Sequence, residues 1–284
     1  MYHVRTVSDP RRLDRTGAAV EYEVHPAAPV GVVLGYAHDW LAKDSAGRDA
    51  APSYSAGVYY DVTPRTRLRA AASRRIRFPT VSQLYDPTGG NPALSSERAT
   101  EYDAGIEQEL AAGSRASLSV FHTDVYGYIE RPAPGQPFAN YSAYRFRGAE
   151  LTAETAAFAR LLLRGGYTFL DTHDRSPGAQ FQALQYRPRH KATLEARYAL
   201  PGGPAVVASI MRVNGQVYFS RTTPRREANL AGYTLVKVRL TQAFWERAAT
   251  LYVGADNLLN EAYQEEYGYP QASRAVYAGA AVHW

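Results

Sequence analysis

RFPTVSQLYDPTGGNPALSSERATEYDAGIEQEL, residues 77–110, contains two different patterns. Its first half is rich in Pro, Gly, Asn and Ser and has no period, which indicates a loop. Its second half alternates between apolar and acidic side chains, which is the pattern of a β-strand with two unlike faces. One face carries Tyr102, Ala104, Ile106 and Leu110, and the other carries Glu101, Asp103, Glu107 and Glu109.

A strand of this kind fits two classes of protein. In a soluble protein, its apolar face covers a core and its acids meet bulk water. In a membrane barrel, the apolar face meets lipid and the acids line a wet lumen. The stretch itself leaves both interpretations open, so the rest of the chain has to decide between them.

The same alternation recurs along the chain. The polar faces carry Lys, Arg and Glu deep inside the predicted strands. The apolar faces carry Ala, Val, Leu and Tyr in runs of about five positions, which matches a lipid band of roughly 25 Å. Counting the segments predicts about fourteen strands. The clearest segments are 18–24, 30–40, 54–62, 68–72, 149–154, 192–198 and 236–241.

The connections between the predicted strands are alternately short and long. Short turns are expected at 25–29, 63–65, 111–114, 158–160, 200–204 and 245–249. Longer polar loops are expected at 8–15, 41–52, 77–97, 129–142, 174–186, 219–230 and 258–273. Outer-membrane barrels have short turns at one end and long external loops at the other, whereas a soluble sandwich mixes loop lengths at both ends. The sequence therefore predicts an all-β fold, an antiparallel transmembrane β-barrel.

Composition excludes several other classes of protein. No run of about 18 apolar residues is present, so we predict no transmembrane helix. The absence of Cys excludes a disulfide framework and a thiolate metal site. The net charge of +5 is modest and the basic residues are dispersed, so we expect no nucleic-acid partner. The 22 Tyr suit a surface that lies half in lipid and half in water.

The sequence contains no motif for catalysis or cofactor binding. Nucleophile elbows, phosphate loops and paired Cys or His ligands are missing, so we expect no enzymatic activity, no cofactor and no metal site. Asp171, His173 and Asp174 could bind a cation, although a solvated loop tip is the preferred interpretation. For the charged strand faces, pairing across strands is likewise preferred to a role in substrate passage.

Three groups of residues form recognisable motifs. The first group is Phe78-Pro79-Thr80, Leu84-Tyr85, Gly90-Asn91-Pro92, Leu94 and Glu97. The second is the basic run Arg187-Pro188-Arg189-His190-Lys191, and the third is Asp256-Asn257-Leu258-Leu259-Asn260, Tyr263, Gly268-Tyr269-Pro270 and Arg274. In this order they resemble motifs of the TonB-dependent outer-membrane receptors. The departures are Ser96 in place of the usual Pro, Ala272-Ser273 in place of Pro-Gly, and a final Trp284 where Phe is commoner.

The resemblance implies a protein of the bacterial outer membrane, surrounded by lipid. That family has a signal peptide, a TonB-contact segment and a globular plug, followed by a barrel of about 22 strands. We therefore expect residues 1–284 to be the C-terminal portion of such a barrel, beginning on a strand at 3–7. The signal peptide and the plug are expected to be absent, and the TonB complex to be contacted only through the missing plug. The terminal aromatic, Trp284, is expected to be the assembly signal for the barrel-insertion machinery.

The function implied by the resemblance is TonB-dependent uptake of a metal chelate, such as cobalamin or a ferric siderophore. Because aromatic and Arg side chains make the strongest ligand anchors, the loops provide the candidate ligand contacts, with loop packing as the alternative role of each. These candidates are Tyr85, Asn91, Tyr141, Arg221, Arg225 and Tyr267. The comparatively short loops favour a cobalamin-like receptor. A passive porin-like channel and a soluble β-sandwich binding module are the alternatives, and the sequence does not identify the ligand.

Overall fold

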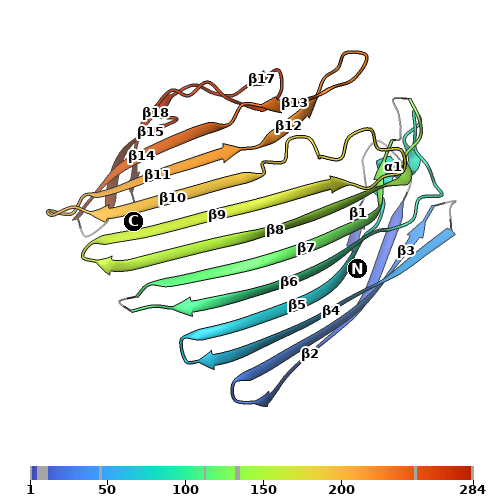
Figure 1. The fold of residues 1–284 in the computed structure, drawn as a ribbon, viewed down its shortest axis with the longest axis horizontal. Coiled ribbons are helices and arrows are strands. Elements are labelled where there is room, and N and C mark those ends of the chain that lie inside the picture. The colour runs from blue at the N-terminus through green and yellow to red at the C-terminus, as the bar shows by residue number, and fades with distance from the viewer. Residues whose placement is uncertain are drawn as a thin grey trace. The chain divides into compact units, whose positions relative to one another are not determined.

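The computed structural model consists almost entirely of β-strands (Figure 1). It describes residues 2–4, 12–44, 47–111, 113–131, 135–245 and 248–282. Within these residues, a 14-stranded sheet has the order β1-β2-β3-β4-β5-β6-β7-β8-β9-β10-β11-β14-β15-β18. The predicted number of about fourteen strands is therefore confirmed.

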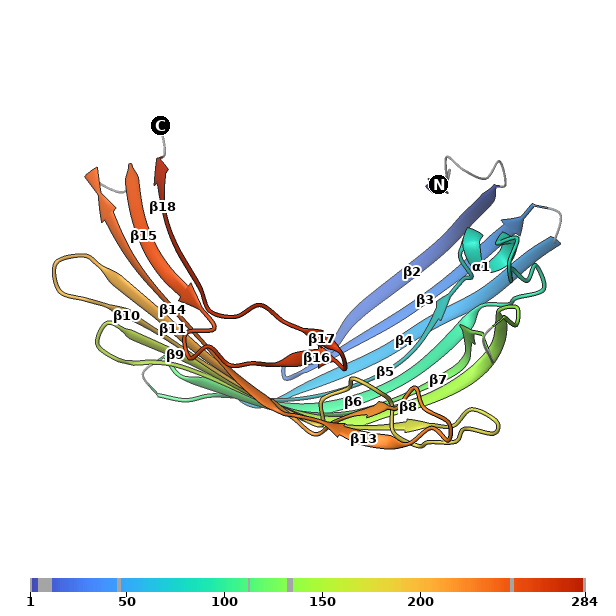
Figure 2. The same ribbon diagram turned by 90° about the horizontal axis from the view of Figure 1, so that it is seen from above.

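The main sheet follows the order of the sequence, apart from two hairpins that stand outside it. Its strands are β1 (Tyr2–Val4), β2 (Leu13–Ala27), β3 (Val30–Lys43), β4 (Gly47–Thr63), β5 (Thr66–Arg77), β6 (Glu97–Glu109), β7 (Arg115–Glu130), β8 (Ala139–Phe158), β9 (Leu161–Asp174), β10 (His190–Ala199), β11 (Ala205–Asn214), β14 (Tyr233–Phe244), β15 (Ala249–Asp256) and β18 (Ala275–Val282). The hairpins are β12 (Gln216–Phe219) with β13 (Glu227–Leu230), and β16 (Gln264–Glu266) with β17 (Tyr269–Pro270). Pairing is antiparallel wherever the register is defined. In Figure 2, the hairpin between β11 and β14 and the hairpin between β15 and β18 each extend past the ends of those strands.

The connections agree with the predicted alternation, except at 41–52 and at the end of the loop predicted at 8–15. All six short turns connect consecutive strands of the main sheet. The predicted loop at 41–52 is wrong, because the ladder between β3 and β4 continues to the pair Lys43 and Gly47. Each added pair satisfies backbone N–H and C=O groups, and this gain outweighs the polar composition of the segment. The predicted strand at 3–7 is described only as far as Val4, and the predicted loop at 8–15 only from residue 12 onward. Within that loop, residues 13–15 belong to β2 and pair with β1 and β3, so the prediction is wrong for them.

The two faces of the strands differ in the way that the alternation predicts. One face, here called the apolar face, keeps large apolar side chains exposed; Val20 is 65% exposed and Tyr102 is 55% exposed. The opposite, charged face carries ion pairs across strands, such as Arg69 with Asp103 at 3.2 Å. Water penalises exposed apolar area by about 25 cal/mol per Å², so an apolar face without a core beneath it indicates an apolar surrounding.

The one helix of the described residues, α1 (Val81–Tyr85), lies in the loop between β5 and β6. Thr80 begins it with a capping box: the Thr80 side chain accepts from the Gln83 backbone N–H, and the Gln83 side chain accepts from the Thr80 backbone N–H. This short helix buries Leu84 and Tyr85. Its start was readable in the sequence as Thr80-x-x-Gln83, although the loop as a whole has no helical period.

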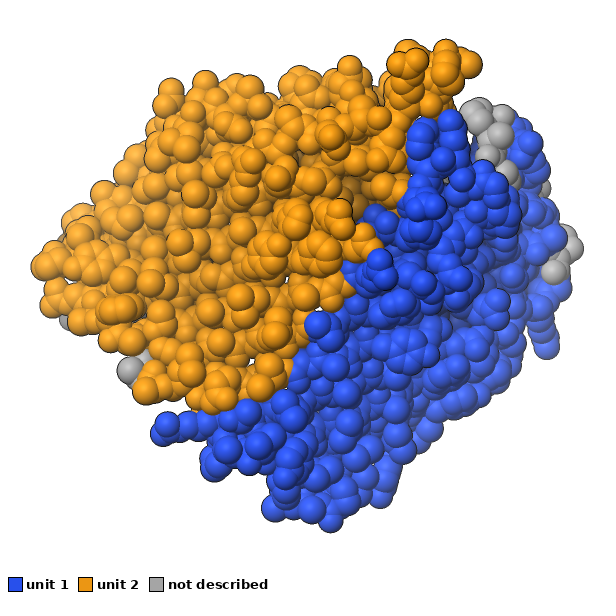
Figure 3. Space-filling view, in the orientation of Figure 1, with its two compact units in different colours: residues 1–105, 120–147, 172–182 blue, residues 106–119, 148–171, 183–284 orange. Residues whose placement is uncertain are grey.

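The strands run through two compact units (Figure 3). Unit 1 comprises residues 1–105, 120–147 and 172–182, and unit 2 comprises residues 106–119, 148–171 and 183–284. Each unit contains long connections, and these carry the motif residues. In the part of the chain that the structure describes, no helix is long and apolar enough to cross a membrane.

Candidate ligand-binding loops

The loop between β5 and β6, residues 78–96, has a packed interior of its own. Leu84 and Leu94 are 0% and 1% exposed and form a cluster with Tyr85 and Ile129. The Tyr85 hydroxyl donates to the backbone carbonyl of Asp44. This loop, here called the folded loop, is therefore an ordered element that packs on strand ends.

Polar contacts fasten the folded loop to more distant parts of unit 1. The Asn91 side-chain amide donates to the Phe138 carbonyl over 2.8 Å, and its oxygen accepts from the Ala93 backbone N–H over 3.0 Å. The Phe138 backbone N–H donates to the Gly89 carbonyl over 2.9 Å. The Asn91 side chain thus satisfies backbone groups on two segments, which a loop of this length needs if its interior is to stay dry.

Gly90 is required by the close approach of the chain to itself. A Cβ at this position would lie 2.5 Å from the Asp86 backbone nitrogen and 2.8 Å from the Leu84 carbonyl oxygen. Backbone atoms cannot move away as a flexible side chain can, so a side chain at residue 90 would distort the folded loop.

Glu97 is the buried charge at the end of the folded loop. It is 5% exposed and accepts from Arg77 through both carboxylate oxygens, with Nε at 2.6 Å from Oε2 and Nη2 on Oε1. The Ile129 backbone N–H donates to Oε1 over 2.8 Å. A buried carboxylate is tolerated when donors satisfy it in this way, so Glu97 joins β5, β6 and β7.

Asp86 lies in the folded loop just after α1. Hydrogen bonds from the Thr88 backbone N–H and hydroxyl, both 2.9 Å, together with the Arg131 guanidinium at 3.0 Å, lower the pKa of the Asp86 carboxyl below its usual value. Its charged form is therefore part of the folded loop at neutral pH.

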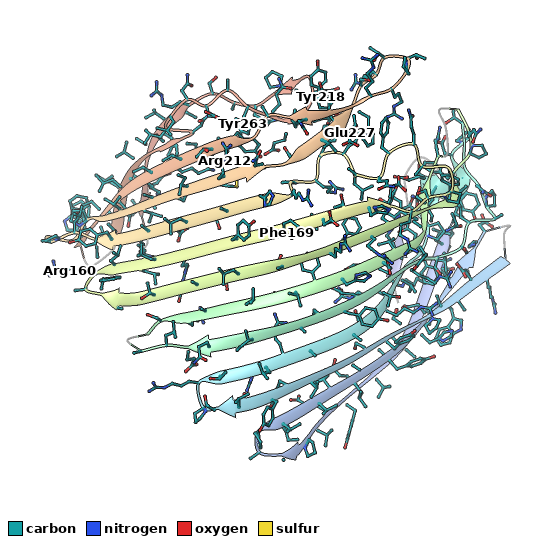
Figure 4. All side chains as sticks on the ribbon, viewed as in Figure 1. Arg160, Phe169, Arg212, Tyr218, Glu227 and Tyr263 are labelled. Atoms are coloured by element: carbon teal, nitrogen blue, oxygen red, sulfur yellow. The ribbon has the colours of Figure 1, made fainter. Side chains whose placement is uncertain are left out.

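In unit 2, two tyrosine pairs connect the segment after β15 to β12 and to the start of β14. Tyr218 of β12 and Tyr267 stack in parallel, with ring centroids 4.1 Å apart and planes 6° apart. Tyr263 lies 4.5 Å from the ring of Tyr233, which is buried. Figure 4 labels Tyr218 on β12 and Tyr263 on the loop after β15. Burial, together with the neighbouring hydroxyl of Tyr267, raises the pKa of the Tyr218 phenol.

The loop at 257–274, here called the C-terminal loop, is organised by its motif residues. The Asn257 side chain donates to the Glu261 carbonyl over 2.9 Å and accepts from the Glu261 backbone N–H over 2.8 Å. The Leu258 backbone N–H donates to the Val236 carbonyl over 2.8 Å. Arg274 Nη1 donates to the Leu258 carbonyl over 3.3 Å. These residues therefore build the loop, and its aromatic side chains are held at defined positions.

The structure places the six predicted ligand contacts in three different settings. Tyr85 is 5% exposed, and Asn91 is hydrogen-bonded within the folded loop, so both hold the loop together. Tyr141 donates to the Pro177 carbonyl and is 36% exposed. Tyr267, Arg221 and Arg225 are exposed on unit 2 loops. Ligand contact by any of them stays a prediction.

Arg225 and Tyr267 contact consecutive residues of β12. The Arg225 guanidinium lies 5.6 Å from the centre of the Phe219 ring, and Tyr267 stacks on Tyr218. Because successive side chains of a strand point to opposite faces, these two contacts lie on opposite faces of the β12–β13 hairpin. Sequence reasoning missed Tyr218, whose only signal was an aromatic pair, Tyr218-Phe219, just before an Arg-rich turn.

Three further motif residues, Phe78, Pro79 and Pro92, lie at or near the start of the folded loop or on its surface. Phe78 lies 5.7 Å beneath the Arg15 guanidinium, Pro79 is buried, and Pro92 is exposed at the surface of the folded loop. Trp284, the predicted assembly signal, lies outside the described residues.

The charged face of unit 2 carries a ladder of alternating charges. Glu154 accepts from Arg164 over 2.5 Å and pairs with Arg115 at 3.3 Å. Lys237 lies 3.5 Å from Asp256. Beside this ladder, a hollow of about 540 Å³ is lined by small residues such as Gly166, Thr193 and Ser209 and by Glu195 and Lys237. Pairing across strands is thus the main role of these charges, as the preferred interpretation of the sequence had it.

Within the described ranges, no group of three or more His, Cys, Asp or Glu side chains is placed so that it could hold a metal ion. Asp171 instead lies 3.6 Å from the Arg189 guanidinium, and Asp174 accepts from the Ser176 backbone N–H over 2.8 Å. The loops offer aromatic, amide and guanidinium groups, which suit recognition of a ligand.

Comparison with known families identifies the barrel to which these loops belong. A family model described as TonB dependent receptor-like, beta-barrel, matches residues 4–258. The chain belongs to this family. TonB-dependent receptor barrels lie in the bacterial outer membrane, and so does this chain. The predicted fold class, an antiparallel transmembrane β-barrel, is confirmed.

Individual relatives cover nearly all of the chain. The vitamin B12 transporter BtuB of Vibrio cholerae serotype O1 is 25% identical, over 95% of this chain and 44% of its own length. The siderophore receptor PirA from Acinetobacter baumannii superposes with a TM-score of 0.79 at 15% identity, over 95% of this chain and 46% of that chain. The copper transporter OprC gives a TM-score of 0.77 at 17% identity, over 95% and 47%. This TonB-dependent receptor chain thus spans less than half the length of the relatives that it matches.

Proposed function

We propose that this chain is the ligand-capturing barrel of an outer-membrane receptor for TonB-dependent uptake of a metal chelate. The observation that carries the proposal is the order built into its loops. The family motifs coincide with a folded loop that has its own buried cluster and with a C-terminal loop whose exposed Tyr267 stacks on Tyr218 of β12. Loops organised before a ligand arrives lose less conformational entropy on binding it.

We further propose that residues 1–284 are the C-terminal portion of the barrel. The coverage supports its being part of a longer protein, since the match takes in 95% of this chain and 44% of the vitamin B12 transporter. Contact with the TonB complex then belongs to a plug domain outside this sequence. Recognition by the barrel-insertion machinery belongs to Trp284.

The proposed ligand is cobalamin or a ferric siderophore, which the loops bind and release without chemical change. The relatives support these two classes, because one is named a vitamin B12 transporter and another a siderophore receptor. The exposed unit 2 side chains Tyr267, Arg221 and Arg225 are the proposed anchors, since a flat ring and guanidinium groups suit a large, planar or anionic chelate that reaches both faces of the β12–β13 hairpin.

Equilibrium dialysis of the purified chain in detergent, with cyanocobalamin and ferric enterobactin as probes, tests the proposal. Saturable binding of one probe is expected, and Tyr267→Ala should weaken it about tenfold by removing a stacked ring. Tyr22→Ala, which removes a tyrosine of similar exposure from the apolar face, is the matched control and should bind normally.

Two results would contradict the proposal. If neither probe bound, cobalamin and ferric siderophores would be excluded as the ligand. If Tyr267→Ala bound as well as the unsubstituted chain, Tyr267 would be excluded as an anchor. A passive porin-like channel, the alternative, predicts solute flux without saturable binding.

A further inference from the structure

One charged cluster of unit 1 lies on the apolar face. Val120 and Tyr126 of β7 are 52% and 40% exposed on that face. Because side chains two apart on a strand share a face, His122 and Asp124 lie on it between them. The cluster sits near the end of β7 from which the long connection to β8 leaves.

Two guanidinium groups surround the single carboxylate of this cluster. Arg145 donates to both oxygens of Asp124, from Nε over 2.8 Å and from Nη2 over 3.1 Å. Arg175 Nη1 donates to Asp124 Oδ1 over 3.3 Å and to the Tyr126 hydroxyl over 3.3 Å. His122 Nε2 lies 3.1 Å from Asp124 Oδ2. Asp124 neutralises one arginine, so the cluster keeps at least one positive charge.

A surplus cation on a lipid-facing surface needs a partner. Neutralising Asp124 requires only one arginine, and Arg145 already makes the bidentate pair. Arg175 is then held in place by a carboxylate and a phenol, with its side chain 37% exposed. A charge inside the hydrocarbon is costly, whereas a charge at the level of the headgroups can pair with an anion there.

We infer that the Arg145–Asp124–Arg175 cluster binds a phosphate group of a lipid in the leaflet at the loop end of the barrel. The Nε–Nη2 edge of Arg175, which makes none of the hydrogen bonds above, is a guanidinium fork that matches phosphate oxygens, and Asp124 holds both arginines in position. Val120 and the ring of Tyr126 lie beside the cluster, where they can contact the acyl chains and the headgroup of the same lipid. The inference rests on the outer-membrane location and is independent of ligand uptake.

Arg175→Gln is the variant that tests the inference with little risk to the fold, because it leaves the Arg145–Asp124 pair intact. The full chain, purified in detergent, is exposed to diphosphoryl lipid A and to its dephosphorylated form, and retained lipid is counted by native mass spectrometry. We expect the unsubstituted chain to retain the phosphorylated lipid at least fivefold better than the dephosphorylated one. Arg175→Gln should abolish this preference, and Arg175→Lys should restore part of it.

Arg197→Gln is the matched control, because it removes the same charge from the charged face of β10. This variant should retain the phosphorylated lipid as the unsubstituted chain does. Equal retention by Arg175→Gln, or equal retention of both lipid forms by the unsubstituted chain, would overturn the inference. So would displacement of the lipid by equimolar inorganic phosphate, since the site would then recognise free anion and no lipid. The heat-dependent shift in electrophoretic mobility verifies that each variant is folded.

Discussion

Glu97 couples the family motif to the stability of the sheet. Its side chain is almost fully buried, and its donors come from two strands, through Arg77 of β5 and the Ile129 backbone of β7. A motif residue in such surroundings has a structural role, because removing its side chain leaves buried hydrogen-bond donors without acceptors. Asn257 has the same role in the C-terminal loop, where it bonds to both the N–H and the carbonyl of Glu261.

Removing the Glu97 carboxylate should destabilise the sheet. Glu97→Ala leaves the Ile129 N–H and the Arg77 guanidinium without their acceptor, and the expected cost is about 2–3 kcal/mol, less than for a fully buried pair because Arg77 is half exposed. Urea unfolding in lipid bilayers measures this cost. Glu109→Ala, at the exposed end of the same strand, should change stability little; equal costs for the two would show that the Glu97 contacts contribute nothing.

Asp86 should make the order of the folded loop dependent on pH. Its pKa is lowered in the folded loop by Thr88 and Arg131, so its contribution is fully present above the unfolded value, near 3.8. That contribution is lost as the pH falls through the lower, folded pKa. Cleavage of the folded loop by pepsin should therefore accelerate below about pH 4. In Asp86→Asn cleavage should vary with pH only as the protease itself does, and an unchanged profile in this variant would exclude Asp86 as the group responsible.

Strands were predictable because one physical rule governs most of their residues. A lipid-facing position cannot carry a charge without cost, so the period of two persists along strands such as β6 and β10. The loops obey no such local rule. The Tyr85–Asp44, Asn91–Phe138 and Tyr218–Tyr267 contacts join residues that are distant in sequence, so neither the folded loop nor the tyrosine stack could be read from the chain. The loop predicted at 41–52 failed for a related reason, because pairing with β3 determines its conformation.

Adjacent positions on β10 should differ sharply in their tolerance of a charge. Leu194 is 49% exposed on the apolar face, and Thr193 faces the charged side beside Gly166. If Leu194 lies near the bilayer midplane, Leu194→Arg should cost about 2–4 kcal/mol, whereas Thr193→Arg should be mild. Unfolding in bilayers measures both variants. Equal costs would show that the apolar face does not contact lipid.

The alternation of apolar and acidic side chains along β6 has a single explanation once the whole chain is considered. The acids of β6 face a polar side where Arg69 pairs with Asp103, and its apolar side chains are left exposed. In a soluble β-sandwich the same apolar side chains would cover a core. The match to the TonB-dependent receptor family places the barrel in a membrane, so the surface that contacts these apolar side chains is lipid.

Solubility should therefore depend on a lipid-like surrounding. Exposed apolar side chains occur on strands in both units, from Val20 on β2 to Val276 on β18. Each Å² of this surface costs about 25 cal/mol in water, so removal of detergent should drive the chain into aggregates. Transfer to lipid nanodiscs should keep it monodisperse and rich in β-sheet. Light scattering and far-ultraviolet circular dichroism, measured before and after detergent removal, make the comparison. A chain that stays monodisperse and folded in plain buffer would restore the soluble-sandwich alternative, because only a covered apolar face is compatible with water.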